Sequence, residues 1–369
     1  MSWQPVRRLG GASPGGLALP PAAPAPDQMY APRGVWTDGE RVVATDTGNH
    51  RVLIWHSWPD SDGAPADVVL GQPDMWSEGP AAGGTDVARG LNLPTGVAVV
   101  DGDLVVADAW HHRLLRYDGL PQKDFEAPVA VIGQPSPVDV EPNRGGGASA
   151  TSFYWPFGFG VAGGRFWVAD TGNRRVLGWD GEGVPEPERA PDVLLGQDDD
   201  TTRLDNRGSE QGPSSFRWPH AVAGDAGRLY IADAGDHRVL GWSPAPSSDS
   251  PAGLVLGQEG FDAFDEFKNR PQGAHRMRFP YAVVLEGALL AVADTSNNRV
   301  LLWDDAPSAG AGIPADAVLG QPDFDSNGEN RWDAVHDDSF CWPYGLSLAG
   351  DVLAVADSGN NRVTIWRRS

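Results

Sequence analysis

The sequence is poor in cysteine, in lysine and in long apolar runs. Cys341 is the only cysteine among 369 residues, which excludes an internal disulfide and a paired-thiolate metal site and fits a reducing compartment. Lys123 and Lys268 are the only lysines, so arginine carries nearly all the positive charge. No stretch approaches the roughly 18 consecutive apolar residues of a membrane span. We therefore expect a cytoplasmic protein without a membrane segment.

The charge balance is strongly acidic. Asp and Glu number 50 against 28 Lys and Arg, which gives a net charge of −22. Such a surface repels polyanions, so we expect no nucleic-acid partner and no anionic membrane surface as a partner. Glycine and proline are abundant, with 47 and 32 residues, and they interrupt short apolar runs. This punctuation favours many short strands joined by turns.

One segment occurs six times, and the copy at 168–179 is "VADTGNRRVLGW". Its arginine recurs every 61 to 63 residues, and its aspartate keeps the same period. The six pairs are Asp46 and Arg51, Asp108 and Arg113, Asp170 and Arg175, Asp233 and Arg238, Asp294 and Arg299, and Asp357 and Arg362. A fixed period of this length with strand-like content predicts a repeat architecture, and its closed all-β form is a propeller.

Each repeat contains one strand after a proline, two strands around the Asp–Arg segment, and a fourth that ends in Gly-Gln. The first three strands occur six times, but the fourth occurs only five times. The segment 5–11 places Leu9 one repeat length before Leu70, the leucine of the first repeat's fourth strand. We therefore predict a single all-β domain over 1–369. It is a six-bladed propeller with four antiparallel strands per blade, the last blade completed by 5–11.

The N-terminal segment also has an export-like pattern, an arginine pair followed by a mildly apolar stretch up to Ala25. Prolines interrupt that stretch, and cleavage after it would remove the strand that closes the ring. We therefore expect the segment to be structural and the protein to remain in the cytoplasm.

The repeated segment, preceded by a strand such as "PTGVAV", resembles the NHL repeat. Together with "LGQPDF", "NRW" and "FCWPYG" it is similar to long-repeat bacterial NHL proteins. The resemblance covers nearly the whole chain and implies a six-bladed propeller. It implies little about activity, because one propeller architecture hosts unrelated functions.

We expect the repeated residues to be scaffold, because one central site has no use for six identical sets. The Asp and Asn of each hairpin are predicted to satisfy turn amides, the glycine to permit a positive φ, and the arginine to pair with the aspartate or cap carbonyls. The aromatic residue that ends each third strand is predicted to pack between neighbouring blades. These residues are Trp55, Tyr117, Trp179, Trp242, Trp303 and Trp366.

Function is expected where the repeats differ, and the links between blades are the first such place. They are roughly 20–25 residues long, a length that is usually functional or disordered. Asn-Arg pairs at 143–144, 206–207, 269–270 and 330–331 recur in them with the repeat period, which predicts that the links are ordered.

The residue after the repeat proline varies from blade to blade. We predict that these residues line the channel mouth and bind a small molecule or peptide, since the set mixes charge, hydroxyl, imidazole and aromatic groups. The alternative is that they are tolerant rim positions. They are Arg33, Thr95, Phe157, His220, Tyr281 and Tyr344.

Large aromatic residues just before the proline are candidates for partner binding, the alternative being that they anchor the long links. They are Trp155, Trp218, Phe279 and Trp342. The second repeat adds Trp110, His111 and His112, with tryptophan at a turn position that holds glycine in most repeats. That replacement predicts an altered or strained turn.

The candidates for catalysis and metal binding are few. His220 is the candidate general acid or base, with Tyr281 or Tyr344 nearby. Some NHL-type propellers are amidating lyases that hold a metal with several axial histidines, but a three-histidine site does not follow from the spacing here. Asp323, Asp325 and Asn327 match the start of a calcium loop, but Ala334 stands where its last ligand belongs, so a turn is the better interpretation.

The leading hypothesis is a binding or accessory propeller, a monomer that presents one face to a protein, peptide or small molecule at the channel mouth. The alternative is a lyase or hydrolase with its active site in that mouth. A weaker alternative is an accessory factor of a metalloenzyme such as a hydrogenase, with which long-repeat bacterial NHL proteins are associated. The cofactor stays open, and a divalent metal ion is one option.

Overall fold

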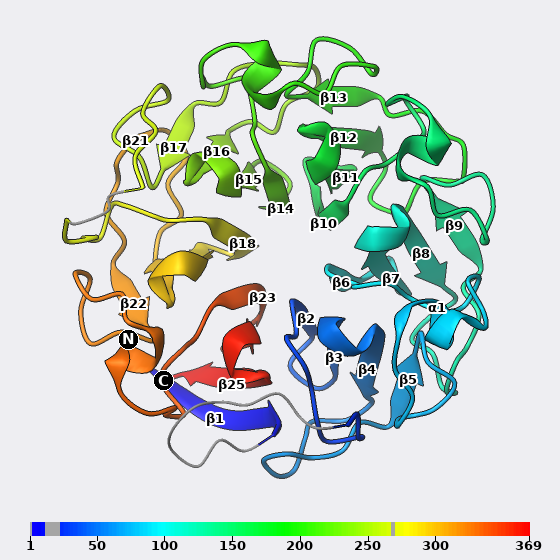
Figure 1. Ribbon diagram of the computed structural model, residues 1–369. Coiled ribbons are helices and arrows are strands. Elements are labelled where there is room, and N and C mark those ends of the chain that lie inside the picture. Colours follow the sequence, from blue (N-terminus) through cyan, green and yellow to red (C-terminus); the bar gives the residue numbers. More distant parts are fainter. Residues whose placement is uncertain (1, 12–22, 267–269) are drawn as a thin grey trace.

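The computed structural model describes residues 2–11, 23–266 and 270–369, so the export-like stretch lies largely outside the described residues. Six antiparallel sheets surround a central axis like the blades of a propeller (Figure 1). Within each blade the strands follow one another from the channel to the outer edge. This is the predicted six-bladed fold.

The first three blades follow one another along the chain. Their strands are β2 (Gly34–Thr37), β3 (Val42–Asp46), β4 (Arg51–Trp55) and β5 (Val68–Leu70) in blade 1, β6 (Val97–Val100), β7 (Asp103–Asp108), β8 (Arg113–Tyr117) and β9 (Ala130–Ile132) in blade 2, and β10 (Pro156–Ala162), β11 (Arg165–Asp170), β12 (Arg175–Asp180) and β13 (Val193–Leu195) in blade 3.

The other three blades repeat the plan. Their strands are β14 (Pro219–Gly224), β15 (Leu229–Asp233), β16 (Arg238–Trp242) and β17 (Leu254–Leu256) in blade 4, β18 (Pro280–Glu286), β19 (Leu289–Asp294), β20 (Arg299–Trp303) and β22 (Ala317–Leu319) in blade 5, and β23 (Pro343–Ala349), β24 (Val352–Asp357), β25 (Arg362–Arg368) and β1 (Trp3–Gly10) in blade 6. A short parallel strand, β21 (Gly310–Ala311), extends blade 4 beyond the predicted four strands.

The N-terminal strand completes blade 6, as predicted. β1 pairs antiparallel with β25, with Leu9 opposite Val363, and the two ends lie side by side in Figure 1. Leu9 is fully buried in a cluster that joins blades 6 and 1. Arg8 lies within ion-pair distance of Asp62 and Asp337, which belong to those same two blades. The ring therefore closes through both apolar and charged contacts.

The core consists of six apolar clusters, each shared by two neighbouring blades. The aromatic residue that ends each third strand is buried in one of them, as predicted. Trp179 of blade 3, for example, packs with Val105 and Leu114 of blade 2. Because the clusters bridge blades, they hold the innermost strands at fixed positions around the axis.

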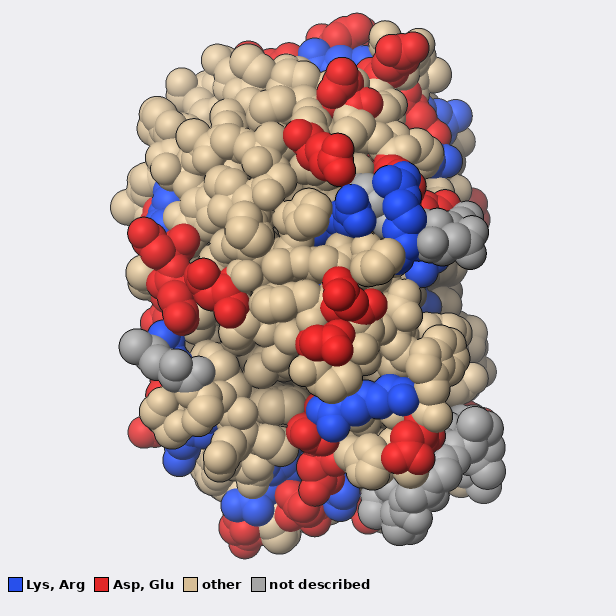
Figure 2. All heavy atoms as spheres, turned by 90° about the vertical axis from the view of Figure 1, so that its left-hand side faces the viewer, with Lys and Arg blue, Asp and Glu red and all other residues tan. Residues whose placement is uncertain are grey.

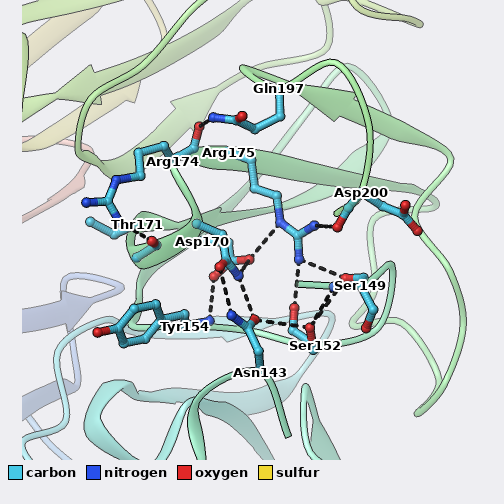
Figure 3. A network of polar contacts seen from close by, with 12 residues as sticks. Asn143, Ser149, Ser152, Tyr154, Asp170, Thr171, Arg174, Arg175, Gln197 and Asp200 are labelled. Atoms are coloured by element: carbon cyan, nitrogen blue, oxygen red, sulfur yellow. Dashed lines mark hydrogen bonds and ion pairs between the residues drawn. The ribbon is translucent and has the colours of Figure 1, made fainter. Parts of the chain in front are cut away.

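Each repeated arginine is a buried hub for the links. In blade 3 the Nε of Arg175 donates to Asp170 at 2.8 Å, and its terminal nitrogens donate to the carbonyls of Ser149, Ser152 and Asp200 (Figure 3). The other Oδ of Asp170 accepts the backbone N–H of Tyr154, at 2.7 Å. The arginine thus pairs with the aspartate and also caps carbonyls, which confirms both predicted roles. The repeated segment is scaffold.

Short 3-10 turns follow the second strands. They are η1 (Thr47–Asn49), η2 (Ala109–His111), η4 (Thr171–Asn173), η6 (Ala234–Asp236), η7 (Thr295–Asn297) and η9 (Ser358–Asn360). The prediction that their glycine provides the positive φ is wrong, since the left-handed residue is the one after the turn, such as Arg174. The glycine instead allows close approach, because a Cβ on Gly172 would lie 2.4 Å from the carbonyl oxygen of Tyr154.

The turn's Asp and Asn also act differently from the prediction. The aspartate accepts an amide from the link before the first strand rather than from its own turn, and the asparagine donates to that aspartate. In blade 3 the Nδ2 of Asn173 donates to Asp170 at 2.7 Å and to Asn143 at 2.8 Å. The turn is therefore a junction between the blade and the preceding link.

Within the described residues the links are ordered, as predicted from their periodic Asn-Arg pairs. Each described pair has left-handed φ values, 51° and 58° at Asn143 and Arg144, and it closes a single turn. These turns, with the equivalent in blade 1, are α1 (Pro80–Gly84), η3 (Pro142–Gly145), η5 (Asp205–Gly208) and η8 (Glu329–Trp332). The pair at 269–270 lies partly outside the described residues. Within the ranges that the structure describes, no helix is both long and apolar enough to cross a membrane.

Candidate functional site

An axial cavity of about 290 Å³ lies between the six innermost strands. The predicted ligand-binding residues Arg33, Thr95, Phe157, His220, Tyr281 and Tyr344 all line it. Glycine or alanine follows each of them, and a Cβ on Gly34 would lie 2.0 Å from the carbonyl oxygen of Thr95. This confirms the close packing predicted for that position, which makes the channel narrow.

Five of the six predicted residues take part in a continuous ring of contacts. The ring centroids of Phe157 and His220, of His220 and Tyr281, and of Tyr281 and Tyr344 are each 4.5 Å apart. The guanidinium carbon of Arg33 lies 4.9 Å from the Tyr344 ring. Aromatic faces and an arginine in this arrangement attract one another through the ring quadrupole.

Trp110 closes the ring. Its indole lies 5.6 Å from the Phe157 ring, and the Arg33 guanidinium lies 6.0 Å from the indole. We define the mouth ring as one residue from each blade in order, Arg33, Trp110, Phe157, His220, Tyr281 and Tyr344. Neighbouring members of this closed ring lie 4.5 to 6.0 Å apart, so the six side chains leave only a small opening between them. The mouth ring therefore narrows the channel entrance.

Thr95 is the predicted residue outside this ring. It is buried, and its hydroxyl donates to the carbonyl of Phe157 at 2.8 Å. Because the Thr95 side chain is small, Trp110 fills the part of the channel mouth that lies next to blade 2. Sequence reasoning grouped Trp110 with partner binding and missed this role. The second repeat differs from the others in two ways that could have predicted this role. It has a small residue after the proline, and it has a large residue in the turn.

The prediction of a strained turn at Trp110 is wrong. The turn η2 has the same form as the others, and the residue after it, His112, has φ 56°, against 55° for His50 in blade 1. Tryptophan is accommodated because the turn position itself needs no positive φ.

His111 and His112, predicted to contact a partner, are both buried. The Nδ1 of His111 lies 2.8 Å from Oδ2 of Asp108, and four other blades have an asparagine at the position of His111. The Nδ1 of His112 accepts the backbone N–H of Trp155 at 3.1 Å, and burial lowers its pKa to about 4. Both side chains therefore serve the scaffold in the described structure.

The aromatic residues before the prolines surround the mouth ring. The ring centroids of Trp155 and Trp110 are 5.5 Å apart, and those of the stacked rings of Trp218 and Phe279 are 6.3 Å apart. Trp342 is the most open of the four, 50% exposed. These residues form the outer rim, which we define as Trp155, Trp218, Phe279 and Trp342.

The polar groups of the mouth ring are neutral except for Arg33. Burial, reinforced by the charge of Arg33, lowers the pKa of His220 to about 4, so the imidazole is uncharged at neutral pH. Its Nδ1 donates to the carbonyl of Trp218 at 2.9 Å, which leaves the lone pair on Nε2. Burial and the neighbouring Tyr344 raise the pKa of Tyr281, so that hydroxyl stays protonated.

No three His, Cys, Asp or Glu side chains of the described residues lie close enough together to hold a metal ion. At the calcium candidate, Asp323 accepts the backbone N–H groups of Asp325 and Ser326, at 3.0 and 2.8 Å. The backbone carbonyl of Asn327 accepts the side chain of Asn298. The segment is a hydrogen-bonded turn.

A family model described as the NHL repeat matches residues 91–117, which contain β6, β7 and β8. The same strands recur in all six blades. The protein is therefore a six-bladed β-propeller that contains an NHL repeat. Among proteins of curated function, none matches its sequence.

Several solved structures share the fold of this propeller. Hydrazine synthase from Kuenenia stuttgartiensis is 12% identical with a TM-score of 0.52, covering 96% of this chain and 98% of that one. A protein of unknown function from Bacteroides thetaiotaomicron is 12% identical with a TM-score of 0.50, covering 99% and 75%. Virginiamycin B lyase from Staphylococcus aureus is 12% identical with a TM-score of 0.46, covering 94% and 98%. At these identities the likeness describes the fold alone.

Proposed function

We propose that this NHL-repeat propeller is a binding module that receives a protein, peptide or small molecule at its channel mouth. The observation that carries the proposal is the mouth ring, which takes one side chain from each blade. Five different residue types occur among its six members, whereas the repeated Asp–Arg hubs are fully used by the scaffold. Variable groups on a rigid support are typical of a recognition site.

The outer rim supports the same proposal. Large aromatic side chains around a concave centre provide contact area at a small cost in conformational entropy. By contrast, the edge of the disc shows acidic and basic side chains scattered among uncharged residues (Figure 2). We propose the mouth ring and the outer rim together as the binding face of a monomer in the cytoplasm.

The enzyme alternative comes second because of His220. A general base works best with a pKa near the working pH, and burial lowers the pKa of this imidazole to about 4. With so low a pKa, His220 is a weak base, which suits hydrogen bonding to a ligand better than proton abstraction.

Site-specific photo-cross-linking tests the proposal. A benzophenone amino acid at Trp342, on the outer rim, is expected to cross-link a defined partner in the native cell extract. The same probe at Glu286, which is exposed at the opposite end of an innermost strand, is the matched control. Equal cross-linking of the same partner from both positions, or none from Trp342, would contradict the proposal.

The variant Trp110→Gly tests the mouth ring itself. Glycine is the residue that blades 1, 3, 4 and 6 carry at this position, so the turn should still form. We expect the Trp342 cross-link to fall at least fivefold while the melting temperature changes little. An unchanged cross-link yield would remove the mouth ring from the binding face.

A further inference from the structure

Arg33 is the one charged residue among those that line the axial cavity in the described chain. Its Nε is buried and has no hydrogen-bond partner within the described residues. Other arginines also have a buried Nε without a hydrogen-bond partner among the described residues, but each of them forms an ion pair with a carboxylate. No such contact is found for Arg33 in the described part of the chain. In a protein with a net charge of −22, a half-buried cation without a carboxylate is exceptional.

The position of Arg33 is fixed by stacking. The guanidinium lies over the Tyr344 ring at 4.9 Å and near Trp110 at 6.0 Å. Stacking uses the face of the guanidinium and leaves the N–H groups along its edge for hydrogen bonds. The charge acts within the mouth, since it adds to the burial that lowers the pKa of His220 and opposes the rise that burial causes in the pKa of Tyr281. The mouth ring therefore contains a positive charge that stacking fixes in position and that no carboxylate of the described residues neutralises.

The surroundings restrict which anion fits. The cavity of about 290 Å³ is at the small end for ligand sites, and most of its lining is apolar or aromatic. The protein's net charge opposes the approach of a multiply charged anion. A carboxylate carries one charge, and its two oxygens accept two parallel hydrogen bonds from one edge of a guanidinium. Tyr281 adds a protonated hydroxyl nearby.

We infer that Arg33 binds the carboxylate of the ligand at the mouth, and that this ligand is a monocarboxylate with an apolar or aromatic body. The inference rests on the proposed function and names its ligand class. The carboxylate has two sources with the same chemistry, a free small acid and the C-terminus of a peptide.

Calorimetric titration with matched acid and amide probes tests the inference. The small probes are 3-phenylpropionate and 3-phenylpropanamide, and the peptide probes are an uncharged pentapeptide that ends in phenylalanine, with a free or an amidated C-terminus. We expect the acids to bind at least tenfold tighter than their amides. Preference for the acid in only one pair supports the inference and assigns the source of the carboxylate. Equal binding of acid and amide in both pairs, or no binding of either acid at millimolar concentration, overturns it.

Substitutions then assign the effect to Arg33. Arg33→Gln should remove the preference for the acids, and Arg33→Lys should keep part of it. The matched control is Arg367→Gln, because Arg367 also stacks on a tryptophan, Trp58, but lies outside the mouth. Loss of the preference in the control, or its persistence in Arg33→Gln, would overturn the assignment. The comparison of acid and amide on the unchanged protein stands even if a variant fails to fold.

The two proposals fail in different ways. A Trp342 cross-link without any preference for the acids would refute the carboxylate and keep the binding face. The absence of both the Trp342 cross-link and the preference for the acids would refute the proposed function as well.

Discussion

At the residue scale, blade 4 departs from its neighbours at Asp236. The equivalent residue in four other blades is an asparagine whose Nδ2 donates to the repeat aspartate at 2.7 to 2.9 Å. Asp236 places a second carboxylate beside Asp233 instead. Burial first, with repulsion from Asp236 added and Arg238 opposing, raises the pKa of Asp233 to about 6. The Oδ2 of Asp236 lies 3.3 Å from a terminal nitrogen of Arg238, so one arginine serves two buried carboxylates in this blade.

We predict that Asp236→Asn stabilises the protein by about 1 kcal/mol at pH 7, because it replaces repulsion by a hydrogen bond. The pKa of Asp233 is higher in the folded state than its unfolded value of about 3.9. Its contribution to stability is therefore present below that value and lost as the pH rises through about 6. The variant's advantage should grow between pH 4 and pH 7, as measured by urea unfolding at each pH.

The reciprocal variant is the control for this prediction. Asn173→Asp creates the same pair of carboxylates in blade 3 and should destabilise the protein by a similar amount at pH 7. An Asp236→Asn protein that is less stable than the parent at pH 7 would contradict our account of the turn.

At the element scale, neighbouring blades are joined by a hydrogen bond to the residue before the proline. In five of the six blades, the side chain that follows the turn accepts that residue's backbone N–H. The acceptors are Nδ1 of His50, His112 and His237 and Oδ1 of Asn298 and Asn361. The five donors have left-handed φ values, from 46° at Leu93 to 53° at Trp342. A non-glycine residue in this region is strained, so the hydrogen bond holds a strained backbone in place.

Blade 3 provides the exception that supports this explanation. Arg174 follows its turn and has no acceptor atom, and Trp218 in blade 4 does not have a positive φ. The backbone N–H of Trp218 donates to Asp233 of its own blade instead, at 3.0 Å. Three of the chain's histidines are therefore explained as links between blades.

We predict that His112→Leu destabilises the protein by about 1 to 3 kcal/mol, because it leaves the N–H of Trp155 without an acceptor. His112→Asn should cost much less, since asparagine fills the same role in blades 5 and 6. Chemical unfolding of both variants measures the difference. Equal losses for leucine and asparagine would show that packing of the ring, rather than the hydrogen bond, is what matters.

At the scale of the whole molecule, stability depends on β1 as much as on any internal strand. Leu9 and Leu70 occupy equivalent positions in blades 6 and 1, and both are fully buried. We predict that Leu9→Ala and Leu70→Ala each lower the free energy of unfolding by about 2 to 5 kcal/mol. Urea unfolding of the two variants side by side provides the measurement. A far smaller loss for Leu9→Ala would mean that β1 frays and contributes little to closure.

The sequence predicts the architecture well because the repeat averages out local ambiguity. Six copies of one pattern identify the strands. Because the sixth repeat lacks a fourth strand of its own, the matching residues around Leu9 could be predicted to replace it. The left-handed turns of the links and the role of the turn glycine could not be predicted. They depend on contacts such as the one between Gly172 and Tyr154, which only the assembled blade brings together.

The candidate site could be predicted only in part. Positions after the proline were located because their register within the repeat is fixed, and all six line the cavity. The place of Trp110 could not be derived from register, since its side chain reaches the mouth from a turn and fills space left by Thr95. Such compensation between two sites is invisible until the blades are placed around the axis.

The closure of blade 6 has a consequence for biosynthesis. The ribosome makes β1 before the strands of the other blades, yet its partner β25 is translated after all of them. Until then the nascent chain carries an unmatched strand at one end and an incomplete sheet at the other. Partial products released early would expose both edges to intermolecular pairing, so truncated translation products of this protein should be targets for chaperones or proteolysis.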